Sequence, residues 1–152
     1  MAAKPMVVSI RIAAPPERVF ERISDLSQHE AFTDHFLVDW EDAGPDHVSV
    51  RADLPGPEDR SEIDVVEREA PHRLVEQLTG AGGKRRARST WTLEPGGEGT
   101  TLVTFTTEPQ ATPASERLMG PLIRRWMRRG NEKSLARLRD LVEGGADGAP
   151  SR

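Results

Sequence analysis

The chain of 152 residues contains no cysteine and no tyrosine, and it has no long run of apolar residues. Without cysteine it can form no disulfide, no thiolate nucleophile and no thiolate metal site, which is compatible with a reducing compartment. Ser9 and Arg11 interrupt the apolar residues near the N-terminus, so the sequence predicts neither a signal peptide nor a membrane-spanning segment. We therefore expect a cytoplasmic protein.

The sequence has no large excess of positive or negative charge, since its net charge is −4. Charged residues make up 30% of the chain and hydrophobic residues 36%. This balance is typical of a globular protein and does not favour DNA binding or a disordered chain. A length of 152 residues suits one domain with one core. We expect that domain at residues 6–143, with flexible ends at 1–5 and 144–152.

The first structural signal is a strand that leads directly into a helix. Val8, Ile10 and Ile12 alternate with polar residues, which predicts a half-buried strand. Pro16 and Glu17 then supply the fixed φ and the early acidic charge that are typical of a helix start. The order of these elements is the most informative feature of the N-terminal region.

Two short helices are predicted after this strand. The first carries apolar residues at helical spacing, namely Val19, Phe20, Ile23 and Leu26. Ser27 and Glu30 have the spacing of a capping box, which predicts that a second helix begins at Ser27. Phe32 and Phe36 are then expected to face inward.

From Leu37 to Glu108 short β-rich runs alternate with turn residues. The turn segments are 43–46, 55–59, 70–71, 80–83 and 95–99. These five breaks predict six strands, and the N-terminal strand makes a seventh. Short links between strands favour an antiparallel sheet.

The strand from Lys84 to Glu94 has the clearest pattern of the seven. Its apolar face carries Trp91 and Leu93, but the same face has only small side chains at Ala87 and Ser89. A packed core would place bulk at those positions, so the pattern indicates space in front of the sheet.

The last predicted element is a helix from Pro121 to about Glu143, which would be about 35 Å long. Gly130 lies in the middle of its apolar face, where a glycine costs about 1 kcal/mol relative to alanine. That glycine either permits close packing or a bend, or leaves space for a ligand.

The same helix is also strongly basic. Its cationic residues are Arg124, Arg125, Arg128, Arg129, Lys133, Arg137 and Arg139. They form either a solvated face balanced by acidic residues or a docking surface for RNA, an acidic partner or an anionic membrane.

Three segments carry a resemblance to a known superfamily: residues 10–20, residues 91–100 and residues 136–143. Through them the chain resembles the START-like, or helix-grip, superfamily and, within it, the polyketide cyclase/dehydrase branch. The resemblance implies an α+β fold in which a seven-stranded antiparallel sheet wraps around the long C-terminal helix. It also implies an internal cavity for a hydrophobic ligand.

The resemblance places Ala87, Ser89 and Trp91 in this cavity and His29 near its entrance, with Phe36 close by. For the last strand it favours Leu102, Thr104 and Thr106 as inward residues, whereas apolar content favours Val103 and Phe105. The expected ligand-binding residues are His29, Phe36, Arg85, Ala87, Ser89, Trp91, Thr104, Ile123, Trp126, Met127 and Gly130.

Catalysis in such a cavity needs a proton acceptor and a group that stabilises negative charge on a substrate oxygen. Glu67 shares the strand phase of Ile63 and is the candidate base, with Arg85 as an electrostatic clamp. The alternative is that these two residues form a pair at the rim of the sheet with no chemical role. His29 is a third candidate. The four histidines show no metal-ligand spacing, so we expect neither a metal nor a cofactor.

Three functions agree with these observations. The first is a carrier or sensor of a hydrophobic small molecule such as a polyketide, an isoprenoid or a lipid. The second is a cyclase or dehydratase, although the absence of tyrosine and an aromatic content of 5% weaken it, because cyclase cavities are rich in such side chains. The third is an interaction module that uses the basic helix.

Overall fold

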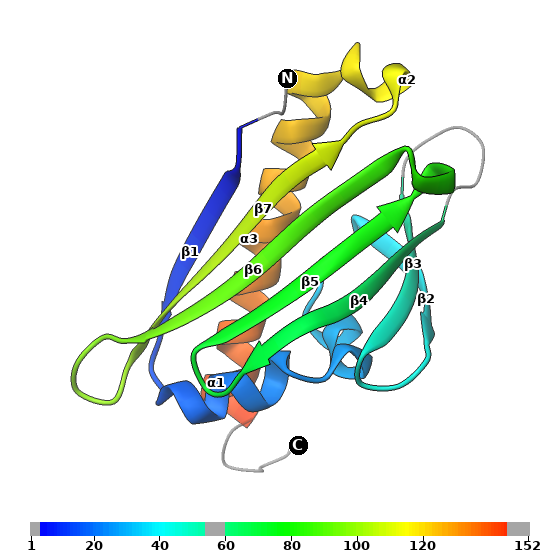
Figure 1. The fold of residues 1–152 in the computed structure, drawn as a ribbon. Helices are drawn as coiled ribbons and strands as arrows, with labels where there is room; N and C mark the ends of the chain where they lie inside the picture. Colours follow the sequence, from blue (N-terminus) through cyan, green and yellow to red (C-terminus); the bar gives the residue numbers. More distant parts are fainter. Residues whose placement is uncertain (1–3, 54–59, 146–152) are drawn as a thin grey trace.

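The computed structural model describes residues 4–53 and 60–145 (Figure 1). The described part contains seven strands in one antiparallel sheet, in the order β1-β7-β6-β5-β4-β3-β2. The strands are β1 (Met6–Ile12), β2 (Leu37–Asp42), β3 (His47–Ala52), β4 (Arg60–Glu69), β5 (Arg73–Gly80), β6 (Arg85–Pro95) and β7 (Thr101–Ala111). The helical segments are α1 (Pro16–Ile23), η1 (Leu26–Ala31), η2 (Ala81–Gly83), α2 (Ala114–Arg117) and α3 (Gly120–Gly145).

The predicted α+β architecture is confirmed. The long helix α3 runs along one face of the curved sheet, and α1 lies beside its C-terminal end (Figure 1). Two hydrogen bonds join these parts: Arg18 donates to the carbonyl oxygen of Val142 at 2.8 Å, and the carboxylate of Glu143 accepts from the backbone N–H of Ala13 at 2.8 Å. The predicted turn at 55–59 lies outside the described residues.

The N-terminal elements follow the sequence pattern with one correction. Helix α1 begins with Pro16, and its apolar stripe is buried as expected. In contrast, η1 is capped by Asp25, whose side chain accepts a hydrogen bond from the backbone N–H of Ser27 at 2.9 Å. The predicted capping box of Ser27 and Glu30 is therefore wrong, because Asp25 already satisfies the first free donor of the helix.

The core occupies only part of the space between the sheet and α3. Its larger cluster lies near α1 and the C-terminal half of α3, and it includes Leu93, Val103, Leu138 and Val142. A smaller cluster under η1 joins strands β3 and β4. The N-terminal half of α3 faces the rest of the sheet across a cavity instead.

Candidate functional site

The cavity has a volume of about 570 Å³ and lies between the sheet, the η1 region and the N-terminal half of α3. This volume lies within the range of small-molecule sites. Most of its surface is apolar, from residues such as Phe32, Ile63, Phe105 and Met127. It extends from the buried side chains of His29 and Glu76 to Gly120 and Arg117 near α2.

The inner face of β6 forms one wall, as the sequence predicts. Arg85, Ala87, Ser89 and Trp91 all line the cavity. The small side chains of Ala87 and Ser89 leave the sheet uncovered there, while Trp91 is 4% exposed and marks the boundary with the core. Residue size along a single strand thus divides the cavity from the packed core.

On β7 the inward residues are those that apolar content favours. Val103 is fully buried in the core, and Phe105 and Thr107 line the cavity. Thr104 does not line it, because successive side chains of a strand point to opposite faces. The assignment of Thr104 as a ligand-binding residue is therefore corrected.

On α3 two of the four predicted residues face the cavity. Ile123 and Met127 line the cavity, whereas Trp126 and Gly130 do not. A Cβ atom on Gly130 would lie 2.5 Å from a ring carbon of Phe36, so the glycine permits close packing and does not leave space for a ligand. Trp126 packs edge-on against Phe36, with ring centroids 5.4 Å apart. Both residues therefore support Phe36, which itself faces the cavity.

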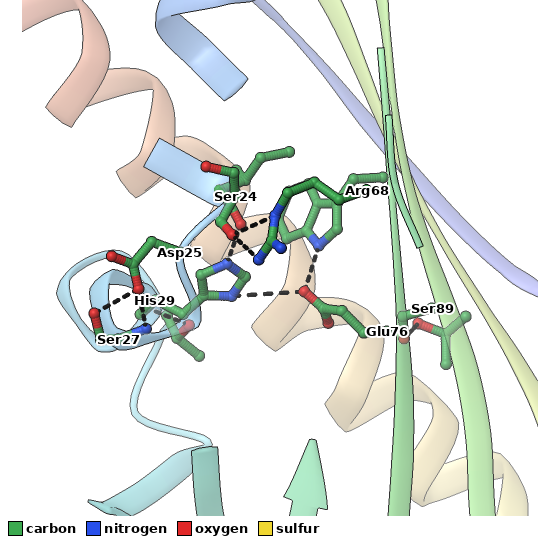
Figure 2. Close-up of polar contacts among 11 residues, drawn as sticks. Ser24, Asp25, Ser27, His29, Arg68, Glu76 and Ser89 are labelled. Carbon is green, nitrogen blue, oxygen red and sulfur yellow. Dashed lines mark hydrogen bonds and ion pairs between the residues drawn. The ribbon is translucent and has the colours of Figure 1, made fainter. Parts of the chain in front are cut away.

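The main polar group of the cavity is Glu76 on β5, which the sequence analysis missed (Figure 2). Its carboxyl group is buried and accepts a hydrogen bond from the indole N–H of Trp91 at 3.0 Å. Burial raises the pKa of Glu76, and nearby His29 and the Trp91 hydrogen bond oppose this shift. The signal in the sequence was a glutamate in phase with Leu74 and Leu78 in the middle of a strand.

His29 lies next to Glu76 and is only 6% exposed. Its Nε2 is 2.7 Å from the carbonyl oxygen of Ile23, and a carbonyl only accepts, so Nε2 carries a proton and donates it. Nδ1 faces Oε2 of Glu76 at 3.8 Å (Figure 2). The resemblance placed His29 near the entrance, but the turn formed by η1 buries it beside the indole of Trp91.

The predicted pair of Glu67 and Arg85 is not assembled. A register shift in β4 between Val65 and Glu67 removes Glu67 from the phase of the inward residues, and its exposed carboxylate pairs with Arg73 at 3.1 Å. Arg85 does line the cavity, but it forms an ion pair with Glu116 on α2. The base assignment for Glu67 is therefore corrected.

Some of the basic residues of α3 have structural contacts. Arg124 donates to the carbonyl oxygens of Lys4 and Pro5 at 2.7 and 2.8 Å, and Arg128 donates to that of Val7 at 3.2 Å. These bonds attach β1, an edge strand, to the helix. Arg125, Arg129 and Lys133 are exposed on the same helix.

Two further findings apply to residues 4–53 and 60–145 alone. No helix there is both long and apolar enough to cross a membrane. Nor do three histidine or acidic side chains in those ranges come together as a metal site would require.

A curved antiparallel sheet that wraps around a long C-terminal helix, with an apolar cavity between them, defines the helix-grip fold. The chain belongs to the family described as polyketide cyclase/dehydrase and lipid transport, whose model matches residues 5–143. No curated protein matches the sequence.

Solved structures of other proteins have the same fold. A protein from Thermus thermophilus is 23% identical with a TM-score of 0.68, and the match covers 94% of this chain and 99% of that one. A START superfamily protein from Mycobacterium smegmatis is 14% identical with a TM-score of 0.68, over 92% and 97% of the two chains. DynU16, from the dynemicin biosynthetic locus, is 24% identical with a TM-score of 0.64, over 94% of this chain and 48% of that one.

Proposed function

We propose that this chain binds one small hydrophobic molecule in the cavity between the sheet and α3 and acts as its carrier or sensor. The observation that carries the proposal is a largely apolar cavity of about 570 Å³ next to a fully packed core. An apolar ligand would gain about 25 cal/mol for each Å² of apolar surface removed from water. Membership of a family that includes lipid transport supports the same class of ligand.

The experiment is native mass spectrometry of the purified protein, followed by solvent extraction and identification of any bound molecule. A polyketide, isoprenoid or acyl lipid bound at one molecule per chain is the expected result. A matched sample of Ala87→Phe, in which a ring fills the space in front of β6, should carry no ligand. A protein that is purified empty and ignores a panel of hydrophobic ligands would refute the proposal.

A second candidate is an enzyme of the cyclase or dehydratase type, and Glu76 is the observation that favours it. A buried carboxyl group whose pKa is raised can take a proton from a substrate carbon near neutral pH. Glu76→Gln should then abolish turnover of an extracted ligand while leaving its binding intact. Unchanged turnover would exclude Glu76 as the base.

The third hypothesis, an interaction module, stays a prediction for the exposed Arg125, Arg129 and Lys133. It requires binding to RNA or to anionic vesicles that weakens with salt. Replacing these three residues by glutamine should then reduce binding, and cavity variants such as Ala87→Phe should not.

A further inference from the structure

The hydrogen bonds at the inner end of the cavity determine which atoms of His29 and Glu76 can donate or accept a further hydrogen bond. Nε2 of His29 donates to Ile23, so a neutral His29 offers only the lone pair of Nδ1 to its other side. The Nδ1 atom lies 3.8 Å from Oε2 of Glu76, which is too long for a direct hydrogen bond. Both side chains are buried and both line the cavity.

Two atoms 3.8 Å apart leave no room for an oxygen atom between them, but an oxygen that lies to the side of the line joining them can contact both. An oxygen about 2.8 Å from each would complete a hydrogen bond on both sides. When Glu76 is protonated, that oxygen must accept from Glu76 and donate to Nδ1. When the proton is on Nδ1 instead, it must accept from His29 and donate to the carboxylate.

A hydroxyl group satisfies both arrangements, because it donates one hydrogen bond and accepts others. A ketone oxygen only accepts, so it can complete a hydrogen bond with one of the two facing atoms and not with both, and an alkane completes neither. We propose that Glu76 and His29 form a hydroxyl-binding subsite, which selects an apolar alcohol that enters the cavity with its hydroxyl end first. This inference rests on the proposed function, and it specifies the chemical class of the ligand.

The indole of Trp91 completes the subsite. Its N–H donates to Oε2 of Glu76 at 3.0 Å, and its ring packs against Phe105 with centroids 4.4 Å apart. The Glu76 side chain is therefore held by a residue that is itself fixed in the core. Because these side chains are already held in place, they lose little conformational entropy when a ligand binds.

The test measures displacement of the fluorescent probe N-phenyl-1-naphthylamine by three molecules with one carbon skeleton: 2-decanol, 2-decanone and decane. We expect 2-decanol to bind about five- to tenfold more tightly than 2-decanone, the value of one additional hydrogen bond. Decane should bind most weakly. Because this comparison uses the unaltered protein, it does not depend on the folding of any variant.

Two variants identify the residues responsible. His29→Phe keeps an aromatic ring but removes the Nδ1 acceptor, so affinity for 2-decanol should fall to that for 2-decanone, which should not change. Glu76→Gln keeps a donor and an acceptor, so the preference for the alcohol should persist. His47→Gln, which removes a half-buried histidine outside the cavity lining, is the matched control and should behave like the unaltered protein.

The outcomes separate this inference from the function on which it rests. Equal binding of the alcohol and the ketone would overturn the hydroxyl subsite and leave the hydrophobic cavity intact. Failure of the fluorescent probe and all three molecules to bind would overturn the proposed function and the subsite together. A preference for the alcohol that survives in His29→Phe would overturn the role of His29.

Discussion

The two halves of the space between the sheet and α3 differ in filling but share one backbone framework. In the half near α1, Leu93 on β6 and Leu138 on α3 are 1% and 0% exposed and belong to one core cluster. In the other half, Ala87 on the same strand and Met127 on the same helix border a cavity. Side-chain size along β6 therefore separates the core from the cavity within this framework.

Trp91 forms the boundary between the two halves. Its ring contacts Phe32 and Phe105 at centroid distances of 6.1 and 4.4 Å, while its N–H donates to Glu76 in the cavity. A tryptophan suits this position because its apolar body packs in a core and its single donor needs a polar partner. The core thus holds the polar inner end of the cavity in place.

The largest expected effect is a difference in the free energy of unfolding between a variant in the core half and a variant in the cavity half. Leu138→Ala should lower the free energy of unfolding by about 2–5 kcal/mol, because it leaves a void in a filled core. Met127→Ala removes a side chain of similar size that already borders empty space, and it should cost less than about 2 kcal/mol. Denaturant unfolding of both variants measures the difference, and equal losses would contradict the comparison.

A smaller effect is expected where the cavity wall is itself tightly packed. Gly130→Ala should destabilise the protein, because overpacking costs about 1–3 kcal/mol and exceeds the gain of about 1 kcal/mol in helix propensity. Gly144→Ala on the same helix meets no atom within 4 Å and should be neutral or stabilising. Thermal unfolding checks both variants, and a stabilised Gly130→Ala would show that Phe36 moves freely.

The pH dependence of stability should distinguish the polar inner end from the core. Burial raises the pKa of Glu76 above its ordinary value of 4.5, so its stabilising contribution is complete below that pH and is lost as the pH rises through the raised value. The loss amounts to about 1.4 kcal/mol for each unit of the pKa difference. Urea unfolding across this pH range should show the decline in the unaltered protein and not in Glu76→Gln.

The smallest effect belongs to His47, a half-buried residue outside both halves. The hydrogen bond that His47 donates to the carboxylate of Asp64 raises the pKa of His47, and partial burial opposes this shift. Its stabilising contribution is therefore complete below the ordinary value of 6.5 and is lost as the pH rises through the raised pKa. Solvent screens the ion pair of His47 and Asp64. His47→Gln should therefore change the free energy of unfolding by about 0.5 kcal/mol at most, and added salt should abolish this difference.

The sequence predicts the framework well because local patterns encode it. Alternation identifies the inward face of β6, including the small residues Ala87 and Ser89, and helical spacing identifies the buried side of α1. These patterns depend on neighbouring residues only. The resemblance to the helix-grip superfamily then supplies the arrangement of sheet and helix, which the family match over residues 5–143 supports.

The site is harder to predict because it depends on contacts between distant segments. The irregularity in β4 that turns Glu67 outward has no clear sequence signal, and neither does the packing of Phe36 over Gly130. Glu76 had a signal, as a charged residue between two inward leucines, but its role depends on His29 and Trp91 from other elements. A site whose residues come from three separate segments cannot be predicted from the hydrophobic periodicity of any one segment.

The central claim is that the space in front of the small side chains of β6 is a binding cavity. The most direct test is a titration of N-phenyl-1-naphthylamine into the unaltered protein and into Ala87→Phe, with thermal unfolding of both. We predict one saturable site per chain in the unaltered protein and its loss in Ala87→Phe, with the unfolding temperature maintained. Equal binding by the two proteins would contradict the claim, because the probe would then bind somewhere other than in front of β6.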